Sequence, residues 1–408
     1  MKIVFVNRFY APDHSATSQM LTDLAVALAA GGMDVHVVTS RLCYDDPAQF
    51  FPPREDLDGV SVHRVRTSAF GRGTLVGRTF DYLSFYVAAS ARLLVLLRRG
   101  DVVVAKTDPP LIAVPVRWVA RIRSARTVNW LQDIFPEVAA GLGMGLARGG
   151  FGQVLSWLRN ASLRNASANV VLGPLMRDRV AALGIDLRKI VVIPNWADGA
   201  AVRPVPRDSN LLRSEWGLEE KFVVGYSGNM GRAHEFRTIV DAAAALRGAP
   251  QIVFLFIGGG AQKAMIAAAS AEQGLANLWF KPYQPRVRLE QSLSVADVHL
   301  VTLRPELEGL IVPSKFYGIA AAARPTIFVG DPDGEIGAEI RAADCGRCVR
   351  QGDVDGLVAA IRALHDDAPL RERMGHNARR VFDERYNKPI AIEKWRALLR
   401  AVSEDRTV

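Results

Sequence analysis

The chain has 408 residues, a formal net charge of +9 and an apolar fraction of 49%. This length predicts two or three domains with sizeable cores and excludes a small scaffold held together by disulfides. The three cysteines, Cys43, Cys345 and Cys348, fit a reducing compartment, and the last two are expected to be structural thiols because no second Cys/His pair accompanies them. The chain opens directly on a strand pattern without a signal peptide, and no run of about 18 uncharged apolar residues predicts a membrane span.

The positive charge is concentrated in the first half of the chain. Residues 1–193 carry 23 Lys and Arg against 15 Asp and Glu, whereas residues 194–408 carry 28 against 27. Such asymmetry favours a polyanionic or anionic-surface partner for the first half, and both nucleic acid and a membrane with acidic lipids fit the composition. A solvated arginine-rich surface without a partner is the alternative.

The first half alternates between strand and helix patterns. Strands are expected at residues 2–7, 34–39, 60–66, 101–106, 126–131, 170–172 and 190–193, with a helix ending near residue 30 between the first two. This opening predicts a doubly wound parallel sheet, which binds ligands at the carboxyl ends of its strands. His14 and Asp133 follow such strand ends. The first loop lacks a G-x-G-x-x-G fingerprint, so a dinucleotide is not indicated.

Residues 70–99 form an unusual stretch. They interleave aromatic residues and a leucine run with Arg72, Arg78, Arg92, Arg98 and Arg99. A basic, aromatic, amphipathic helix is typical of an element that lies on a membrane surface. A helix packed in the core is the alternative.

The second half begins a new doubly wound sheet after a linker at residues 194–206. Strands are expected at residues 222–226, 252–257, 278–281, 298–303 and 326–329. The first of these runs into a glycine-rich turn with Gly228, Asn229 and Arg232, which suits a phosphate. Tyr283 and Gln284 follow the third strand.

The strongest local signal lies between residues 304 and 330. An acidic loop with Glu306 and Glu308 leads through Pro313 to Ser314 and Lys315, where an Ala-rich helix opens. Unpaired N–H groups and the positive end of the dipole favour an anion at a helix N-terminus, and a lysine adds a point charge suited to phosphate. An ordinary capped helix is the alternative.

Several motifs together resemble a known family. They are NRFYAPDHSATSQ, DVVVAKTDPP, NWLQDIFPEVA, IPNWAD, GYSGNMGRAHEF, KPYQPR, ADVHLVTL and EGLIVPSKFYGIAAAARP, in this order. The chain resembles the retaining glycosyltransferases of family 4, in particular the colanic acid type that assembles bacterial exopolysaccharides and O-antigens.

The resemblance implies an α/β protein of the GT-B fold, with two Rossmann-like doubly wound domains facing across a cleft. It implies an acceptor-binding domain at residues 1–193, a linker at 194–206 and a nucleotide-sugar-binding domain at 207–388. The C-terminal helix at 389–408 carries Trp395 and Leu398 at helical spacing, and two arrangements stay open for it: crossing back to the first domain or packing on the second.

The resemblance also implies roles for individual residues. Arg232, Lys315, Asp133 and Glu308 would be catalytic, with the first two holding the diphosphate and Asp133 or Glu137 facing the donor sugar or the acceptor. Donor contacts would come from Ser314, Tyr283, Gln284, Gly228, Asn229, Glu306, His14 and Ser15.

One departure from the family concerns its two glutamates, which stand eight positions apart. Counting back from Pro325 places Leu310 and Gly318 at these positions. The second glutamate normally bonds the ribose hydroxyls, so this contact is lost or supplied from elsewhere. Glu306 and Glu308 lie close enough in sequence to replace the first.

The activity implied is transfer of a sugar, such as fucose or an N-acetylated deoxy sugar, from a UDP- or GDP-sugar to a polyprenyl-diphosphate-linked saccharide. Neither a metal nor another cofactor is expected to be required, because Arg232, Lys315 and the dipole of the helix that opens at Lys315 can stabilise the departing diphosphate in place of a metal ion. The expected location is the cytoplasm, peripherally on the inner face of an anionic membrane, and no nucleic-acid partner is expected. A sugar-nucleotide epimerase and a non-catalytic nucleotide-binding homologue remain as alternatives.

Overall fold

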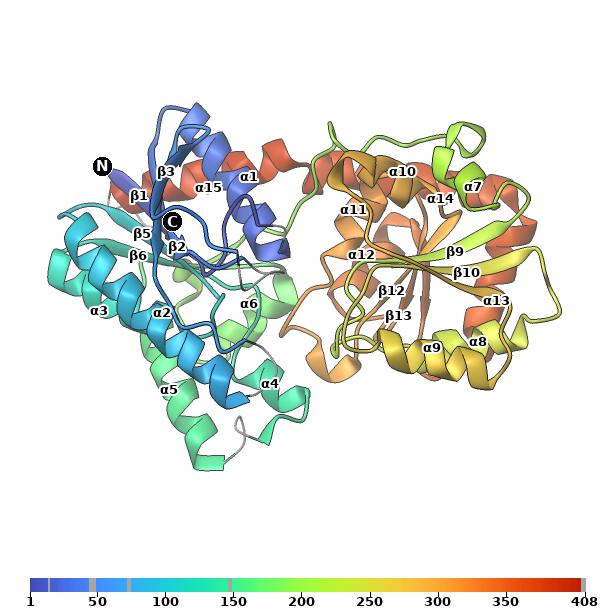
Figure 1. Ribbon diagram of the computed structural model, residues 1–408, viewed down its shortest axis with the longest axis horizontal. Helices are drawn as coiled ribbons and strands as arrows, with labels where there is room; N and C mark the ends of the chain where they lie inside the picture. Colours follow the sequence, from blue (N-terminus) through green and yellow to red (C-terminus); the bar gives the residue numbers. More distant parts are fainter. Residues whose placement is uncertain (14, 44–48, 72–74, 146–148, 405–408) are drawn as a thin grey trace. The chain divides into compact units, whose positions relative to one another are not determined.

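The computed structural model describes residues 1–13, 15–43, 49–71, 75–145 and 149–404 (Figure 1). The chain divides into two compact units, one formed by Met1–Pro194 with Ala391–Val408 and the other by Asn195–Ile390. Each unit contains a sheet of mainly parallel strands with helices packed on it. The predicted architecture of two Rossmann-like α/β domains is therefore confirmed.

The sheet of the N-terminal unit has eight strands in the order β3-β4-β2-β1-β5-β6-β7-β8. The strands that the sequence predicted lie within two residues of those observed. All pair in parallel except β3, an antiparallel edge strand that the sequence did not predict. The bounds are β1 Lys2–Val6, β2 Asp34–Ser40, β3 Arg54–Leu57, β4 Val60–Val65, β5 Val102–Lys106, β6 Arg126–Trp130, β7 Ala168–Val171 and β8 Ile190–Val192.

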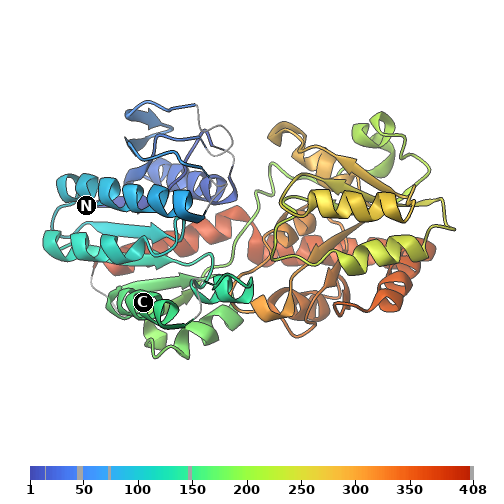
Figure 2. The same cartoon turned by 60° about the horizontal axis from the view of Figure 1, so that its bottom comes forward.

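The helices of this unit are α1 Ala16–Ala30, α2 Leu75–Leu96, α3 Ala113–Arg123, α4 Glu137–Gly141, α5 Gly149–Asn165 and α6 Pro174–Ala181. Crossovers between parallel strands are right-handed, so the helices that lead from β4 to β5, β6 and β7 share one face of the sheet. On that face Phe85, Ala89 and Leu93 of α2 pack with Val116 and Ala120 of α3 over the strands. Figure 2 shows α2 and α3 side by side.

Helix α2 is long and apolar enough to cross a membrane by length and composition alone, over Val76–Leu96. The sequence did not predict this span, because Arg78, Asp81 and Arg92 interrupt the apolar residues. Only 28% of its most apolar window is buried inside the structure, whereas the core helix of a soluble protein would be mostly buried.

The last helix, α15 Lys388–Ser403, ends in the N-terminal unit. The ring of Trp395 is fully buried and lies 4.7 Å from the ring of Trp130 at the end of β6. The Arg126 side chain donates to the backbone oxygen of Ser403. The C-terminal segment is therefore part of the first unit's core.

The sheet of the C-terminal unit has six parallel strands in the order β11-β10-β9-β12-β13-β14. Their bounds are β9 Phe222–Ser227, β10 Ile252–Ile257, β11 Leu278–Lys281, β12 Val298–Thr302, β13 Thr326–Val329 and β14 Gly346–Val349. The helices are α7 Leu211–Glu215, α8 Arg237–Ala245, α9 Lys263–Glu272, α10 Leu289–Ser294, α11 Lys315–Ala321, α12 Glu335–Ala343, α13 Val354–Asp366 and α14 Ala368–Val381.

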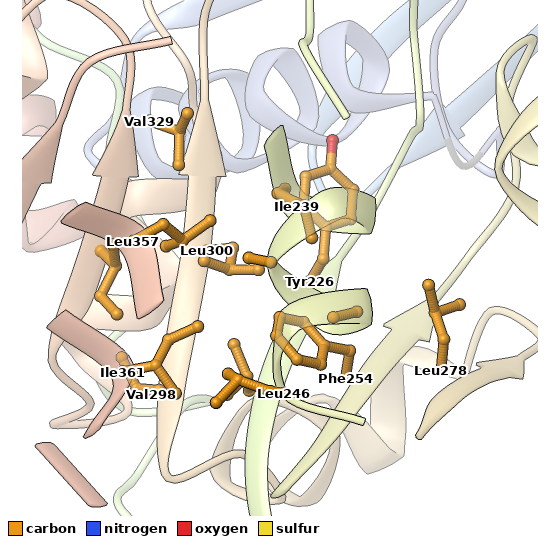
Figure 3. Packing of buried hydrophobic residues seen from close by; sticks show 14 of the residues in the cluster. Tyr226, Ile239, Leu246, Phe254, Leu278, Val298, Leu300, Val329, Leu357 and Ile361 are labelled. Carbon is orange, nitrogen blue, oxygen red and sulfur yellow. The ribbon is translucent and has the colours of Figure 1, made fainter. Parts of the chain in front are cut away.

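The core of this unit lies between the sheet and the helices on one of its faces. Tyr226, Phe254 and Leu300 from the strands pack with Leu357 and Ile361 of α13 (Figure 3). These side chains are at most 1% exposed, so they hold the strand ends in fixed positions.

The edge strand β14 was not predicted, and the Cys345–Cys348 spacing falls at its start. Burial raises the pKa of the Cys345 thiol to about 12 and that of Cys348 to about 11. Both thiols are therefore neutral. Within the described residues no group of three His, Cys, Asp or Glu side chains is placed to hold a metal ion.

Candidate functional site

Two glycine turns pack against each other at the carboxyl ends of the neighbouring strands β9 and β10. The backbone N–H of Gly228 donates to Ile257 O over 2.9 Å, and that of Met230 donates to Gly259 O over 2.7 Å. A Cβ atom at Gly258 would overlap the backbone oxygen of Gly228, and one at Gly260 would lie 2.6 Å from Met230 N. Both positions also have positive φ, so only glycine fits this close backbone contact.

Lys315, the first residue of α11, lies on the turn after β9. Its aliphatic chain runs past Gly228, where a Cβ atom would come within 2.9 Å of Lys315 Cε. Its ammonium lies 5.1 Å from the centre of the Tyr226 ring and 3.0 Å from His234 Nε2. Burial lowers the pKa of Lys315 to about 8.

His234 is neutral and accepts a hydrogen bond from the Lys315 ammonium. Burial, together with the charge of Lys315, lowers the pKa of His234 to about 3. Its Nδ1–H donates to the backbone oxygen of Thr302 at the end of β12 over 2.6 Å, which leaves Nε2 as the acceptor for Lys315. His234 was not predicted as a site residue because its partner Thr302 lies 68 residues away; its place two positions after Arg232 was the available signal.

Arg232 lies on the same turn, with an exposed side chain. It makes no hydrogen bond or ion pair with any residue that the structure describes. The turn itself is anchored, since His234 N donates to Gly231 O and Arg304 N donates to Ala233 O. A fixed backbone thus carries a guanidinium next to the lysine-bearing turn, which is a suitable arrangement for an anion.

Tyr283 and Gln284 follow β11 at the edge of the sheet. The Tyr283 ring, 59% exposed, lies over the β10 turn, where Cβ atoms at Gly258 and Gly259 would come within 3.2 and 3.4 Å of it. Gln284 donates to Pro282 O in its own loop over 3.0 Å. The structure therefore brings Tyr283, but not the Gln284 amide, to the paired glycine turns.

The two candidate glutamates differ in their surroundings. Glu306 is exposed, whereas Glu308 is 7% exposed and accepts a hydrogen bond of 3.2 Å from the backbone N–H of Glu335, the first residue of α12. Burial raises the pKa of Glu308 to about 7. The hydrogen bond from Glu335 N–H opposes this shift, whereas the charges of Asp331 and Glu335 add to it. Glu308 therefore lies at the start of α12.

The start of α11 offers fewer polar contacts than the sequence predicted. Ser314 is exposed and its side chain does not cap the helix, which is seven residues long. Gly318, at the position of the family's second glutamate, is directed at α10, where its Cβ atom would lie 3.3 Å from Leu293 Cδ1. Position 318 thus points towards an apolar neighbour within this unit.

The N-terminal unit has a separate polar cluster at the ends of β5 and β6. Lys106 is 1% exposed; its ammonium donates to Thr17 O over 2.9 Å and lies 3.8 Å from the centre of the Trp130 ring. Burial lowers the pKa of Lys106 to about 7, although Asp108 opposes this shift. Burial, then the charge of Asp108, raises the pKa of Asp133 to about 7, which a hydrogen bond from Thr107 partly offsets.

Asp133 lines a small cavity of about 30 Å³ in this unit, together with Lys106, Thr107, Asn129 and Arg159. Its Oδ1 atom is buried without a hydrogen-bond partner among the described residues. Glu137, by contrast, forms an ion pair of 2.5 Å with Arg159. Asp133 rather than Glu137 is therefore the carboxyl group with unused hydrogen-bonding capacity and a shifted pKa in this cluster.

The loop after β1 carried two further candidates. The Ser15 side chain accepts a hydrogen bond from Ser18 N over 3.4 Å and caps α1, while its own N–H donates to Asp13 Oδ1 over 2.8 Å. Ser15 thus has a local structural role. His14 lies outside the described residues.

Comparison with known families gives matches over both halves of the chain. Residues 15–196 match the family described as "Glycosyl transferase 4-like domain", and residues 208–381 match "Glycosyl transferases group 1". The two matches together leave residues 1–14, 197–207 and 382–408 uncovered.

Two curated proteins are similar over most of their length. One, named as a colanic acid biosynthesis glycosyl transferase, WcaI, of Escherichia coli K12, is 27% identical over 376 residues, which cover 89% of this chain and 91% of that protein. The other, named as the glycosyltransferase WbjE of Pseudomonas aeruginosa, is 29% identical over 326 residues, or 78% of this chain and 79% of that protein.

Solved structures share the fold. Sucrose-phosphate synthase from Thermosynechococcus elongatus superposes with a TM-score of 0.81 at 18% identity, over 99% of this chain and all of that one. HepE from Anabaena in complex with UDP-glucose has a TM-score of 0.71 at 17% identity, over 98% of this chain and all of that one. At these identities the likeness shows the fold.

Proposed function

The chain belongs to the family 4 glycosyltransferases, which have the GT-B fold, and from this premise we propose that it moves a sugar from a nucleoside diphosphate sugar to a lipid-linked saccharide in bacterial surface polysaccharide synthesis. The observation that carries the proposal is a pair of cations at the glycine turn after β9, with Arg232 on the turn and the Lys315 side chain packed against it. The family matches favour transfer over the epimerase alternative.

The two cations suit the charge that develops during transfer. When the bond between the sugar C1 and the diphosphate oxygen breaks, its electron pair passes to the diphosphate. Positive groups fixed in a desolvated site stabilise this growing charge more than they stabilise the ground state. Lys315, partly neutral near pH 8 in the free protein, becomes fully protonated when a diphosphate binds beside it, because a nearby anion favours its charged form.

The new bond forms between the acceptor oxygen and C1. The acceptor hydroxyl attacks on the face from which the diphosphate leaves, and its proton passes to a diphosphate oxygen, so the anomeric configuration is retained. The proposed mechanism uses no side chain of the described residues as a covalent nucleophile. We assign Asp133 to the acceptor, as a hydrogen-bond acceptor for the hydroxyl, because its Oδ1 atom lacks a partner.

The donor is proposed to be a UDP- or GDP-linked sugar. The Tyr283 ring over the β10 turn provides a stacking surface for the nucleoside base, and Lys315 beside the anchored turn after β9 would contact the diphosphate. We propose a deoxyhexose as the transferred sugar. The anionic donor matches the basic residues, so a metal ion is not required in this proposal.

The acceptor is proposed to be a polyprenyl-diphosphate-linked saccharide at the inner face of the cytoplasmic membrane. The first half of the chain carries almost all of the excess positive charge. Arg98 and Arg99 are exposed just after α2, and each such residue near an anionic surface contributes about 1 kcal/mol. Arg72, which the sequence analysis placed in the same basic stretch, lies outside the described residues.

Incubation with radiolabelled UDP- and GDP-sugars and a membrane extract in excess EDTA tests this function. We expect label in the lipid fraction with the chelator present. Isomerised donor would favour an epimerase, and no conversion of any donor would favour a non-catalytic binding protein. Label that appears only after Mg²⁺ or Mn²⁺ is added would contradict metal independence.

A further inference from the structure

The outer helices of the N-terminal unit expose apolar residues in a regular pattern. On α2, Val76, Phe80, Leu83 and Val87 are each more than half exposed and recur every three or four residues, so they form one stripe along the helix. The buried residues of α2, including Phe85, Ala89 and Leu93, occupy the opposite side. The stripe therefore points away from the sheet.

The two neighbouring helices repeat this arrangement. Trp118 and Ile122 on α3 are 55% and 68% exposed and lie one turn apart, opposite the buried Val116 and Ala120. On α5, Phe151, Val154 and Trp157 are each more than half exposed, opposite the buried Gly152 and Leu163.

These helices are neighbours in space, since α2 packs on α3 and α3 packs on α5 (Figures 1 and 2). We call the outward side of α2, α3 and α5 the three-helix face. It holds eleven of the nineteen large apolar side chains that are exposed in the described part of the chain. Soluble monomers rarely expose contiguous apolar patches of this kind without an interaction partner.

The charges on the three-helix face indicate which partner covers it. The sequences of α2, α3 and α5 contain seven arginines, of which Arg159 is buried and paired with Glu137, but only one carboxylate, Asp81. Asp81 is 1% exposed and paired with Arg8, so it does not reach the surface. Arg117 and Arg121 stand beside Trp118 and Ile122 on α3. Apolar and aromatic side chains flanked by arginine, with no exposed acid, match the interface of an anionic bilayer.

We propose that the three-helix face is a bilayer-docking surface, in which Trp118 and Trp157 enter the acyl boundary of an anionic membrane while the arginines contact lipid headgroups. The proposal rests on the proposed lipid-linked acceptor and specifies the surface through which this unit meets the membrane. The proposal adds α3 and α5 to α2 as membrane-contacting helices. Because apolar side chains contribute to binding, we expect high salt to weaken vesicle binding without abolishing it.

Vesicles of phosphatidylglycerol and phosphatidylethanolamine test the proposal with the full-length chain. We expect the tryptophan emission of the wild type to shift to the blue on these vesicles and to be quenched by lipids brominated on their acyl chains. The double variant Trp118→Phe/Trp157→Phe should lose most of that quenching while it still binds. Trp118→Ser/Trp157→Ser should bind at least tenfold more weakly.

The matched control is Leu211→Ser/Met265→Ser, which removes two exposed apolar side chains of the C-terminal unit. It should bind vesicles as the wild type does, and all variants should keep the wild-type thermal midpoint. Unchanged binding of Trp118→Ser/Trp157→Ser, or equal binding to neutral and anionic vesicles, would overturn the proposal. So would a dimer in sedimentation experiments that this variant abolishes, since a second copy would then cover the face.

A soluble assay separates this proposal from the proposed function. With detergent-dispersed lipid acceptor, Trp118→Ser/Trp157→Ser should retain wild-type transfer, because it changes only docking. Loss of vesicle binding with retained transfer supports the surface and the function together. Vesicle binding by a wild-type protein that transfers no sugar would leave the surface standing and contradict the function.

Discussion

The two units each place a buried lysine at the carboxyl end of a parallel sheet, but with different partners. Lys106 donates to the backbone oxygen of Thr17 and lies against the Trp130 ring, so it ties α1 to the end of β5. Lys315 donates to a neutral imidazole and lies beside a glycine turn that packs backbone to backbone against the turn after β10. In both cases burial lowers the lysine pKa, to about 7 and about 8 respectively.

The difference teaches that burial and a shifted pKa do not by themselves identify a catalytic cation. Lys106 already has a strong backbone acceptor and the charge of Asp108 nearby. The acceptor of Lys315 is a histidine that cannot neutralise it, next to an arginine without a partner among the described residues. Lys315 is therefore the cation that gains most from an arriving diphosphate.

The largest expected effect is the loss of Lys315. Lys315→Ala should lower kcat by roughly 100-fold or more, comparable to the removal of one oxyanion-hole donor at about 3 kcal/mol, with the fold intact. Lys106→Met, which keeps the methylene packing on Trp130, should stay within about threefold of the wild type. Steady-state kinetics with thermal midpoints as the folding control checks this pair, and comparable losses in both variants would erase the distinction.

Asp133 should come next in size. Asp133→Asn keeps the side-chain volume but replaces a charged hydrogen-bond acceptor with a neutral one, so we expect kcat to fall about 10- to 100-fold, the size of a lost hydrogen bond to a charged group at about 1.5–3 kcal/mol. Glu137→Gln is the neighbouring control, since Glu137 is paired with Arg159. Its effect should appear in thermal stability more than in turnover.

The pH profile follows from the two shifted groups. Asp133 is ionised above its pKa of about 7, and Lys315 is charged below its pKa of about 8, so kcat/KM for the donor should be highest between these values. It should fall as the pH drops below 7 and as it rises above 8. Asp133→Asn should flatten the acid limb only. A profile that keeps rising to pH 10 would show that the charge of Lys315 is not needed.

The smallest effect on activity is expected at Gly318. Gly318→Glu restores the family's usual residue, yet its side chain would begin 3.3 Å from Leu293 Cδ1. We expect a stability loss of about 1–3 kcal/mol from a carboxylate placed against an apolar neighbour and no gain in donor affinity. Urea unfolding and donor titration check it. Tighter donor binding would mean that position 318 still reaches the ribose.

The sequence predicted the regular strands well because buried parallel strands form continuous apolar runs. It missed β3, whose sequence Arg54–Leu57 is three-quarters charged, and β14, which opens on glycine and arginine. Both are edge strands, which pair with one neighbour only and need not be buried on both faces, so their sequences lack a continuous apolar run. Local patterns therefore carried the centres of both sheets but not all of their edges.

The site was predictable where it depends on neighbouring residues and not where it depends on long-range contacts. Gly228, Asn229, Arg232 and Lys315 could be named from a glycine turn and a helix start. The tether of Lys315 by His234 and the position of Glu308 at α12 depend on contacts across 81 and 27 residues, which no local pattern encodes.

Calorimetric titration of UDP and GDP in excess EDTA tests the central claim, that Lys315 and Arg232 hold the diphosphate without a metal. We expect at least one of the two nucleotides to bind the wild type. Its affinity should be at least tenfold weaker for both Lys315→Ala and Arg232→Ala, and unchanged for Lys106→Met. Binding that requires Mg²⁺ or Mn²⁺, or that is unchanged in both the Lys315→Ala and Arg232→Ala variants, would contradict it.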